Sequence, residues 1–133
     1  MDDEVTTMRQ TLIVLGLVVM AAVAAPLLKA HHSAAGFDST KVKEITGTIR
    51  EFQFKNPHSW IQVIVENEKG EKTEWSVEWG SPNNLGRQGI RPSTFPPGAK
   101  VTIRLNPMDN GGPAGGFVGA RFPDGKTVGR WEP

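Results

Sequence analysis

The chain contains no cysteine among its 133 residues. Disulfide bonds, thiolate metal ligands and cysteine nucleophiles are therefore excluded, although an exported protein could have used them. A marked excess of charge is also missing, since 15 Lys and Arg residues against 14 Asp and Glu residues give a formal net charge of +1. We expect no nucleic-acid partner, because proteins that bind nucleic acids usually carry a clear basic excess.

The usual motifs of hydrolytic enzymes are missing too. The chain has no Gly-x-Ser-x-Gly elbow to present a nucleophilic serine. Glu74 and Glu78 are placed to share one face of a strand, but this spacing is typical of a solvated strand edge. The glycine-rich residues 110–116 lack the lysine of a phosphate-binding loop and are predicted to be a mobile connection. We therefore expect a binding protein rather than an enzyme, with redox chemistry at a metal left open.

The N-terminal 30 residues resemble an export signal. Residues 11–28 are almost entirely apolar, with Arg9 in front and small residues behind. This layout predicts a hydrophobic signal helix within a signal peptide over residues 1–30, and a periplasmic or secreted protein. The acidic residues 2–4 are unlike the basic start of such a signal, so Met8 is an alternative first residue. If the segment stays uncleaved, it would anchor the protein in the inner membrane facing the periplasm, because 18 apolar residues can just span a bilayer.

Two cleavage sites compete in this leader. Ala22-Val23-Ala24 has small residues at the required spacing, but Pro26 follows it closely. Leu28-Lys29-Ala30 is the second candidate, and we favour it. Cleavage there would make His31 the first residue of the mature protein.

The remaining chain is predicted to fold as one all-β domain over residues 43–133, after a flexible lead-in at residues 31–42. Alternation of apolar and polar residues predicts five or six strands, at residues 45–49, 60–65, 74–79, 101–105, 117–122 and 127–131. Phe52 and Phe54 continue the first strand in the opposite phase, which predicts a bulge near Arg50-Glu51.

A short helix is predicted between the third and fourth strands. Ser81-Pro82 offers a helix cap followed by proline, and Gly89 offers a stop. Three strands, a short helix and two or three more strands form the order of a small OB-like β-barrel. A small open sandwich of the same strands is the alternative.

The three histidines carry the main functional hypothesis. An N-terminal His31 would offer its amine and its ring to a metal, and copper favours such nitrogen ligands. His58 could complete a three-nitrogen arrangement like a histidine brace, with His32 as a further ligand. Glu78 is a candidate oxygen ligand or a partner that orients a histidine ring. The sequence thus predicts a copper-binding site formed by His31, His32, His58 and Glu78.

Two other interpretations compete with a metal site. The histidines could be solvated or purely structural, with His58 packing on Trp60 after the turn at Pro57. A second hypothesis is a metal-free periplasmic module that binds a small ligand or a partner protein through an aromatic strand face, since OB-type barrels often bind ligands on aromatic rings. The tryptophans of that face would be Trp60, Trp75 and Trp79.

Motifs along nearly the whole mature chain together resemble the bacterial domain-of-unknown-function 6152 family. They appear in the order expected for that family: His31-His32-Ser33, Thr46-Gly47-Thr48, Asn56-Pro57-His58-Ser59-Trp60, Trp75-Ser76-Val77-Glu78, Gly80-Ser81-Pro82-Asn83, Leu85 with Arg87, Pro97-Gly98 and Pro123-Asp124-Gly125-Lys126. Two segments depart from the pattern, at Gly89-Ile90 and at residues 34–37. The resemblance implies an exported protein of this size and fold, and it implies no assigned chemistry.

Overall fold

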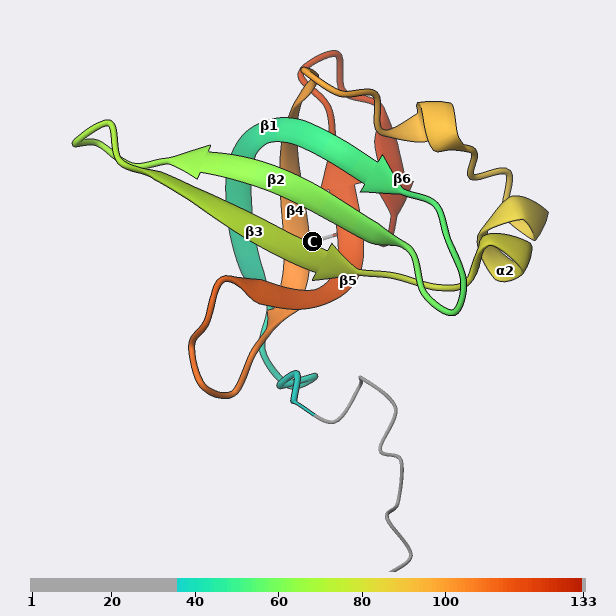
Figure 1. Cartoon of the computed structure of the whole chain (residues 1–133), viewed down its shortest axis with the longest axis horizontal. Coiled ribbons are helices and arrows are strands. Elements are labelled where there is room, and N and C mark those ends of the chain that lie inside the picture. The colour runs from blue at the N-terminus through green and yellow to red at the C-terminus, as the bar shows by residue number, and fades with distance from the viewer. Residues whose placement is uncertain (1–35, 133) are drawn as a thin grey trace, which may run out of the picture. The chain divides into compact units, whose positions relative to one another are not determined.

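The computed structural model describes residues 36–132. The predicted signal helix, both cleavage sites, His31 and His32 lie outside these residues. The described elements are, in chain order, β1 (Lys43–Gln53), β2 (Trp60–Glu66), β3 (Lys72–Glu78), α2 (Pro82–Arg87), η1 (Pro92–Thr94), β4 (Lys100–Pro107), β5 (Ala114–Arg121) and β6 (Thr127–Gly129) (Figure 1). No helix within this part of the chain is long and apolar enough to cross a bilayer.

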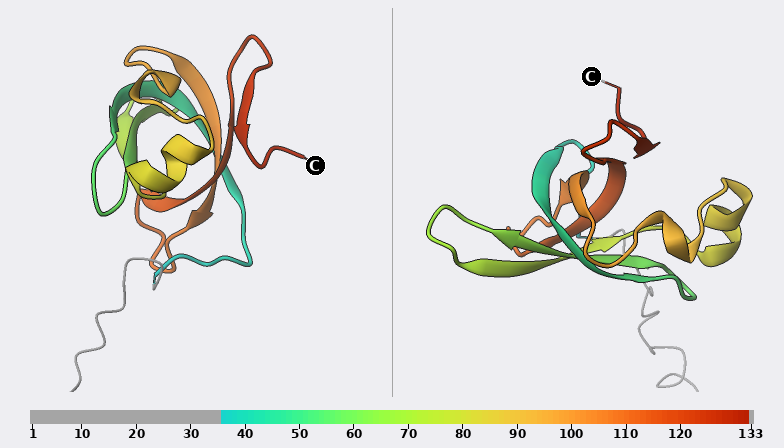
Figure 2. Two further views of the ribbon diagram at one scale, coloured as in Figure 1. Left: turned by 90° about the vertical axis from the view of Figure 1, so that its right-hand side faces the viewer. Right: turned by 90° about the horizontal axis from the view of Figure 1, so that it is seen from above.

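Five of the six strands close into a barrel, which confirms the all-β, OB-like fold. The strands follow the order β3-β2-β1-β4-β5-β6, and β3 also pairs with β5. This additional pairing is parallel, whereas all the other strand pairs are antiparallel. The strand β6 extends the sheet beyond the closed part, and α2 lies at one end of the barrel (Figure 2). The open sandwich is therefore the wrong alternative.

The long first strand makes closure possible because it serves two neighbours. Its first half pairs with β4 and its second half pairs with β2. The register with β2 shifts between Ile49 and Glu51, which confirms the bulge predicted there. Gly47 lets the strands approach closely, since a Cβ at this position would lie 2.3 Å from the carbonyl oxygen of Ile64.

The core contains the apolar residues that the alternation predicted to face inward. Side chains from all six strands contribute, and Ile61, Val63 and Ile103 are completely buried. Phe95 is also completely buried although it follows η1 and belongs to no strand. Its ring contacts those of Phe52, Trp79, Phe117 and Phe122.

Two predictions about the connections have different outcomes. The short helix is confirmed, with Ser81 at its N-cap and proline at its first position. The prediction that residues 110–116 are a mobile connection is wrong for Ala114, Gly115 and Gly116. These three residues begin β5 and form its parallel pairing with β3.

Candidate metal centre

His58 is positioned by the segment that joins β1 to β2. The chain turns at Asn56-Pro57, whose peptide bond is cis, and β2 begins at Trp60. The backbone N–H of Ser59 donates to the carbonyl of Gly80 (3.0 Å), and the N–H of Trp79 donates to the carbonyl of Ser59 (2.8 Å). These bonds continue the β2–β3 ladder past its last strand pair and bring His58 next to the end of β3.

His58 and Glu78 form a side-chain pair at this end of the hairpin. The ring nitrogen Nδ1 of His58 contacts Oε1 of Glu78. The Glu78 side chain is only 7% exposed, whereas that of His58 is 36% exposed. A buried carboxylate needs polar partners, and the ring of His58 is one partner of Glu78.

The chemistry of this pair matches a common feature of metal centres. Histidines that bind metals almost always donate one ring N–H to a carboxylate, a carbonyl or water, which fixes the tautomer and the ring orientation. With Nδ1 directed at Glu78, Nε2 is the nitrogen that such a pair uses as a metal ligand. Glu78 is therefore placed to orient the His58 ring, one of the two roles predicted for it.

The described residues supply only part of the predicted ligand set. His58 and Glu78 are brought together, while His31 and His32 lie outside these residues. Within residues 36–132 no group of three or more His, Asp or Glu side chains is arranged to hold a metal ion. A complete centre would therefore need ligands from the N-terminal segment.

The three tryptophans of the alternative hypothesis do not share one surface. Trp75 and Trp79 are partly buried and pack against the core. Trp79 also stacks on Phe117, with 4.1 Å between the ring centroids. Trp60 pairs with Glu78 across the hairpin and so lies on the opposite side of the sheet from Trp75 and Trp79.

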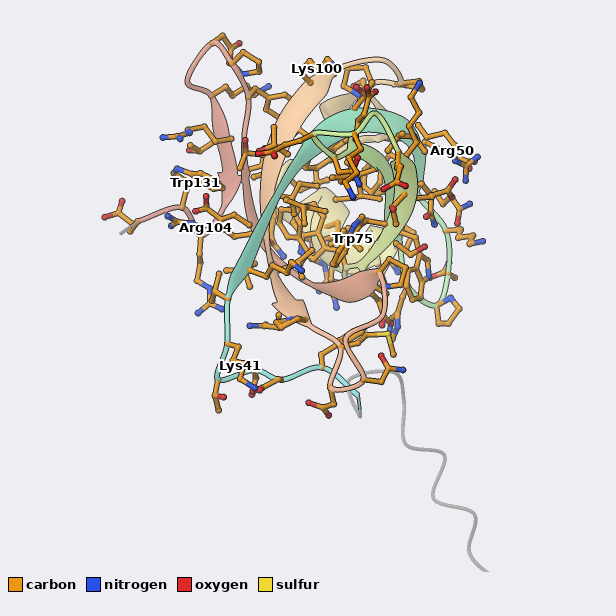
Figure 3. The ribbon with its side chains drawn as sticks, turned by 90° about the vertical axis from the view of Figure 1, so that its left-hand side faces the viewer. Lys41, Arg50, Trp75, Lys100, Arg104 and Trp131 are labelled. Carbon is orange, nitrogen blue, oxygen red and sulfur yellow. The ribbon has the colours of Figure 1, made fainter. Side chains whose placement is uncertain are left out.

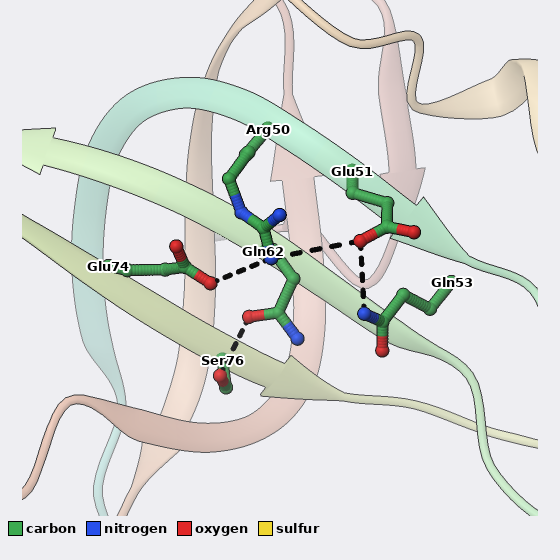
Figure 4. Close-up of polar contacts among 6 residues, drawn as sticks. All are labelled: Arg50, Glu51, Gln53, Gln62, Glu74 and Ser76. Carbon is green, nitrogen blue, oxygen red and sulfur yellow. Dashed lines mark hydrogen bonds and ion pairs between the residues drawn. The ribbon is translucent and has the colours of Figure 1, made fainter.

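A polar network on the outer face of β1, β2 and β3 was missed by the sequence analysis (Figure 4). Arg50 reaches Glu74 at 2.9 Å and Glu51 at 3.7 Å. Next to it, the hydroxyl of Ser76 donates to Gln62 at 2.7 Å. The alternation of polar residues in β3 was a signal for this face, but its cross-strand partners depend on register.

The two carboxylates that lie four residues apart on β3 have different partners. Glu74 is exposed and bound to Arg50, whereas Glu78 is buried against His58. Their environments differ, and each carboxylate has its own basic partner.

Comparison with known proteins gives one structural similarity and one family. The chain resembles the crystal structure of the mitochondrial single-stranded DNA binding protein Rim1 of S. cerevisiae, with 11% sequence identity and a TM-score of 0.47, over 65% of this chain and 97% of that one. No curated protein matches the chain. The model of the family of unknown function DUF6152 matches residues 17–117. The chain therefore belongs to the DUF6152 family.

Proposed function

We propose that this β-barrel domain is exported and binds a copper ion through His58 together with His31 and His32. The contact between Nδ1 of His58 and the buried carboxylate of Glu78 carries this proposal. It is the arrangement that orients a histidine ring for metal binding. The His58 side chain is 36% exposed, whereas the Glu78 side chain is 7% exposed.

The histidine-rich N-terminal segment would supply the remaining ligands. If the leader is cleaved after Ala30, His31 provides both its amine and its ring, which copper favours over oxygen ligands. His32 is the further nitrogen ligand in this scheme. The chain has no cysteine thiolate to offer, and imidazole and amine nitrogens are ligands that suit copper.

The state of the N-terminus and the copper affinity test the proposal together. The protein is purified from the periplasm, its first residue is determined by mass spectrometry, and copper is titrated against the wild type and three variants. We expect His58→Ala to weaken binding strongly. Glu78→Gln should weaken it by about 10-fold to 100-fold, the usual effect of removing a carboxylate that orients a ligand. Glu74→Gln is the matched control, because it changes the same residue type on the same face of β3 and should leave the affinity unchanged.

Each result bears on a separate part of the proposal. A mature start other than His31 would remove the terminal amine as a ligand. An affinity that His58→Ala leaves unchanged would overturn the site as a whole. Circular dichroism of every variant excludes misfolding as the cause of weaker binding.

A further inference from the structure

A second cluster of polar side chains lies on the outer face of β4 and its neighbours. Val101, Ile103 and Leu105 of β4 are buried, so the alternating Lys100, Thr102 and Arg104 face outward. Register places Thr46 of β1 on one side of Thr102 and Arg121 of β5 on the other. Lys100 precedes Thr102 by two residues on the same face. Thr102 is therefore surrounded by Thr46, Lys100 and Arg121, and Arg104 follows two residues further along the same face.

One cleft is lined by Thr46, Lys100, Thr102 and Arg121. It has a volume of about 380 Å³ and is completed by Val101 and by Phe122, Pro123 and Gly125 of the turn before β6. The lining includes Lys100 and Arg121 but no carboxylate. Asp124 belongs to the same turn but not to the lining, and its carboxylate accepts the backbone N–H of Lys126 (2.9 Å). The cleft thus has donors and positive charge, but no acidic side chain of its own.

Each cationic side chain has a contact with a neighbouring residue. The Lys100 ammonium donates to the hydroxyl of Thr48 at 2.8 Å, and the hydroxyls of Thr46 and Thr102 share a hydrogen bond of 2.9 Å. The Arg121 guanidinium lies over the ring of Trp131, 5.0 Å from its centroid. A cation–π contact provides no oxygen acceptor, so the N–H groups of the guanidinium remain available for hydrogen bonds.

Arg104 provides an internal comparison, because it stacks on the same tryptophan at 4.4 Å. Arg104 donates to the carboxylate of Glu44 at 2.7 Å and to two carbonyl groups of the C-terminal segment. Figure 3 shows Arg104 beside Trp131, and Lys100 at the start of the same strand. Neither Lys100 nor Arg121 forms an ion pair with a carboxylate of residues 36–132. Arg104 therefore has a structural role, while the charge of Arg121 is left for a ligand.

We propose that this cleft is an anion-binding site, in which Arg121 binds a carboxylate or phosphate group and Lys100 adds positive charge to the lining. The hydroxyls of Thr46 and Thr102 share one hydrogen bond, so one of the two keeps a proton that it can donate to the anion. A guanidinium presents two parallel N–H groups that match the oxygens of either anion. The site is built from β1, β4 and β5, and it uses none of the residues of the proposed copper centre. The proposal of an anion-binding site therefore does not depend on copper binding.

The test uses two probes that distinguish the source of the anion. Inorganic phosphate and a hexaglutamate peptide are titrated separately into the protein at low ionic strength, and the side-chain Nε–H signal of Arg121 and the backbone signal of Thr102 are followed by NMR. We expect saturable shifts at both signals with at least one probe. Tighter binding of phosphate would indicate a phosphorylated small ligand, and tighter binding of the peptide would indicate an acidic chain.

Variants separate a specific site from general attraction to positive charge. Arg121→Gln should weaken binding by about tenfold or more, because a hydrogen bond to a charged group is lost together with the charge. Lys100→Gln gives a second test that leaves the stacking on Trp131 intact. Lys69→Gln is the matched control, since it removes the same charge in the β2–β3 turn. Shifts that do not saturate with either probe, or equal affinity in Arg121→Gln and Lys69→Gln, would overturn the site.

Discussion

At the scale of single residues, contacts within one hairpin could be predicted from the sequence more readily than contacts across several strands. His58 and Glu78 were both candidates, because one follows the turn before β2 and the other ends β3. The contact of Arg50 with Glu74 was not predicted, since Arg50 lies in the β1 bulge and reaches past β2. The grouping of Lys100 with Arg121 depends in the same way on the β4–β5 register.

Asp38 is a residue whose titration can be predicted from its contacts. Its carboxylate accepts hydrogen bonds from Lys41 and from the side chain and N–H of Thr40, and these lower the pKa of Asp38 from 3.8 to about 2. The same contact raises the pKa of Lys41. A carboxyl group with a lowered pKa stabilises the fold at pH values above its ordinary pKa, and this contribution is lost as the pH falls from about 4 to 2.

We therefore expect the Asp38 carboxyl to titrate near pH 2 in a carboxyl-detected NMR experiment. Lys41→Ala should move this midpoint upward toward the ordinary value, because the largest cause of the shift is removed. Lys126→Ala removes a lysine elsewhere and should leave the midpoint in place. A midpoint near 4 in the wild type would contradict the prediction.

At the scale of elements, alternation identified every strand that has large side chains on its inner face. It did not identify the beginning of β5, because Ala114, Gly115 and Gly116 have little or no side chain to alternate. Those small residues are what the barrel requires there. A Cβ at Gly115 would lie 2.4 Å from the carbonyl oxygen of Asn106 and 2.6 Å from Cδ1 of Leu105. The absence of a side chain lets β5 lie between β4 and β3.

Gly115→Ala should consequently destabilise the barrel. The added methyl group must displace the backbone of β4, and overpacking of this kind typically costs about 1–3 kcal/mol. The free energy of unfolding in urea measures the loss. Gly36→Ala is the matched control, because a Cβ at Gly36 would meet no atom within 4 Å and the variant should unfold like the wild type. Equal stability of the two variants would show that β5 accommodates the methyl group.

At the scale of the whole molecule, the sequence predicted either a barrel or a sandwich. Three residue pairs distinguish these two folds. These are the parallel pairs of β3 with the first residues of β5. Parallel pairing of strands distant in sequence leaves no local pattern, so only the folded chain reveals it. Phe95 is a similar case, since it comes from an irregular segment and contacts the rings of Phe52 in β1 and Phe117 in β5.

The closed barrel and the additional strand should differ in local stability. Both β1 and β4 have a paired strand on each side, whereas β6 is three residues long and pairs only with β5. We expect the amide of Ile103 in β4 to exchange with solvent only through global unfolding. The amide of Val128 in β6 should exchange faster, through an opening that leaves the barrel intact, because a short edge strand has few interactions to lose. Hydrogen exchange followed by NMR at increasing urea concentrations separates these two routes. Exchange at Ile103 should accelerate with the urea dependence of global unfolding. Exchange at Val128 should depend on urea only weakly. Equal rates and equal urea dependence at the two amides would instead mean that β6 and the barrel unfold as one unit.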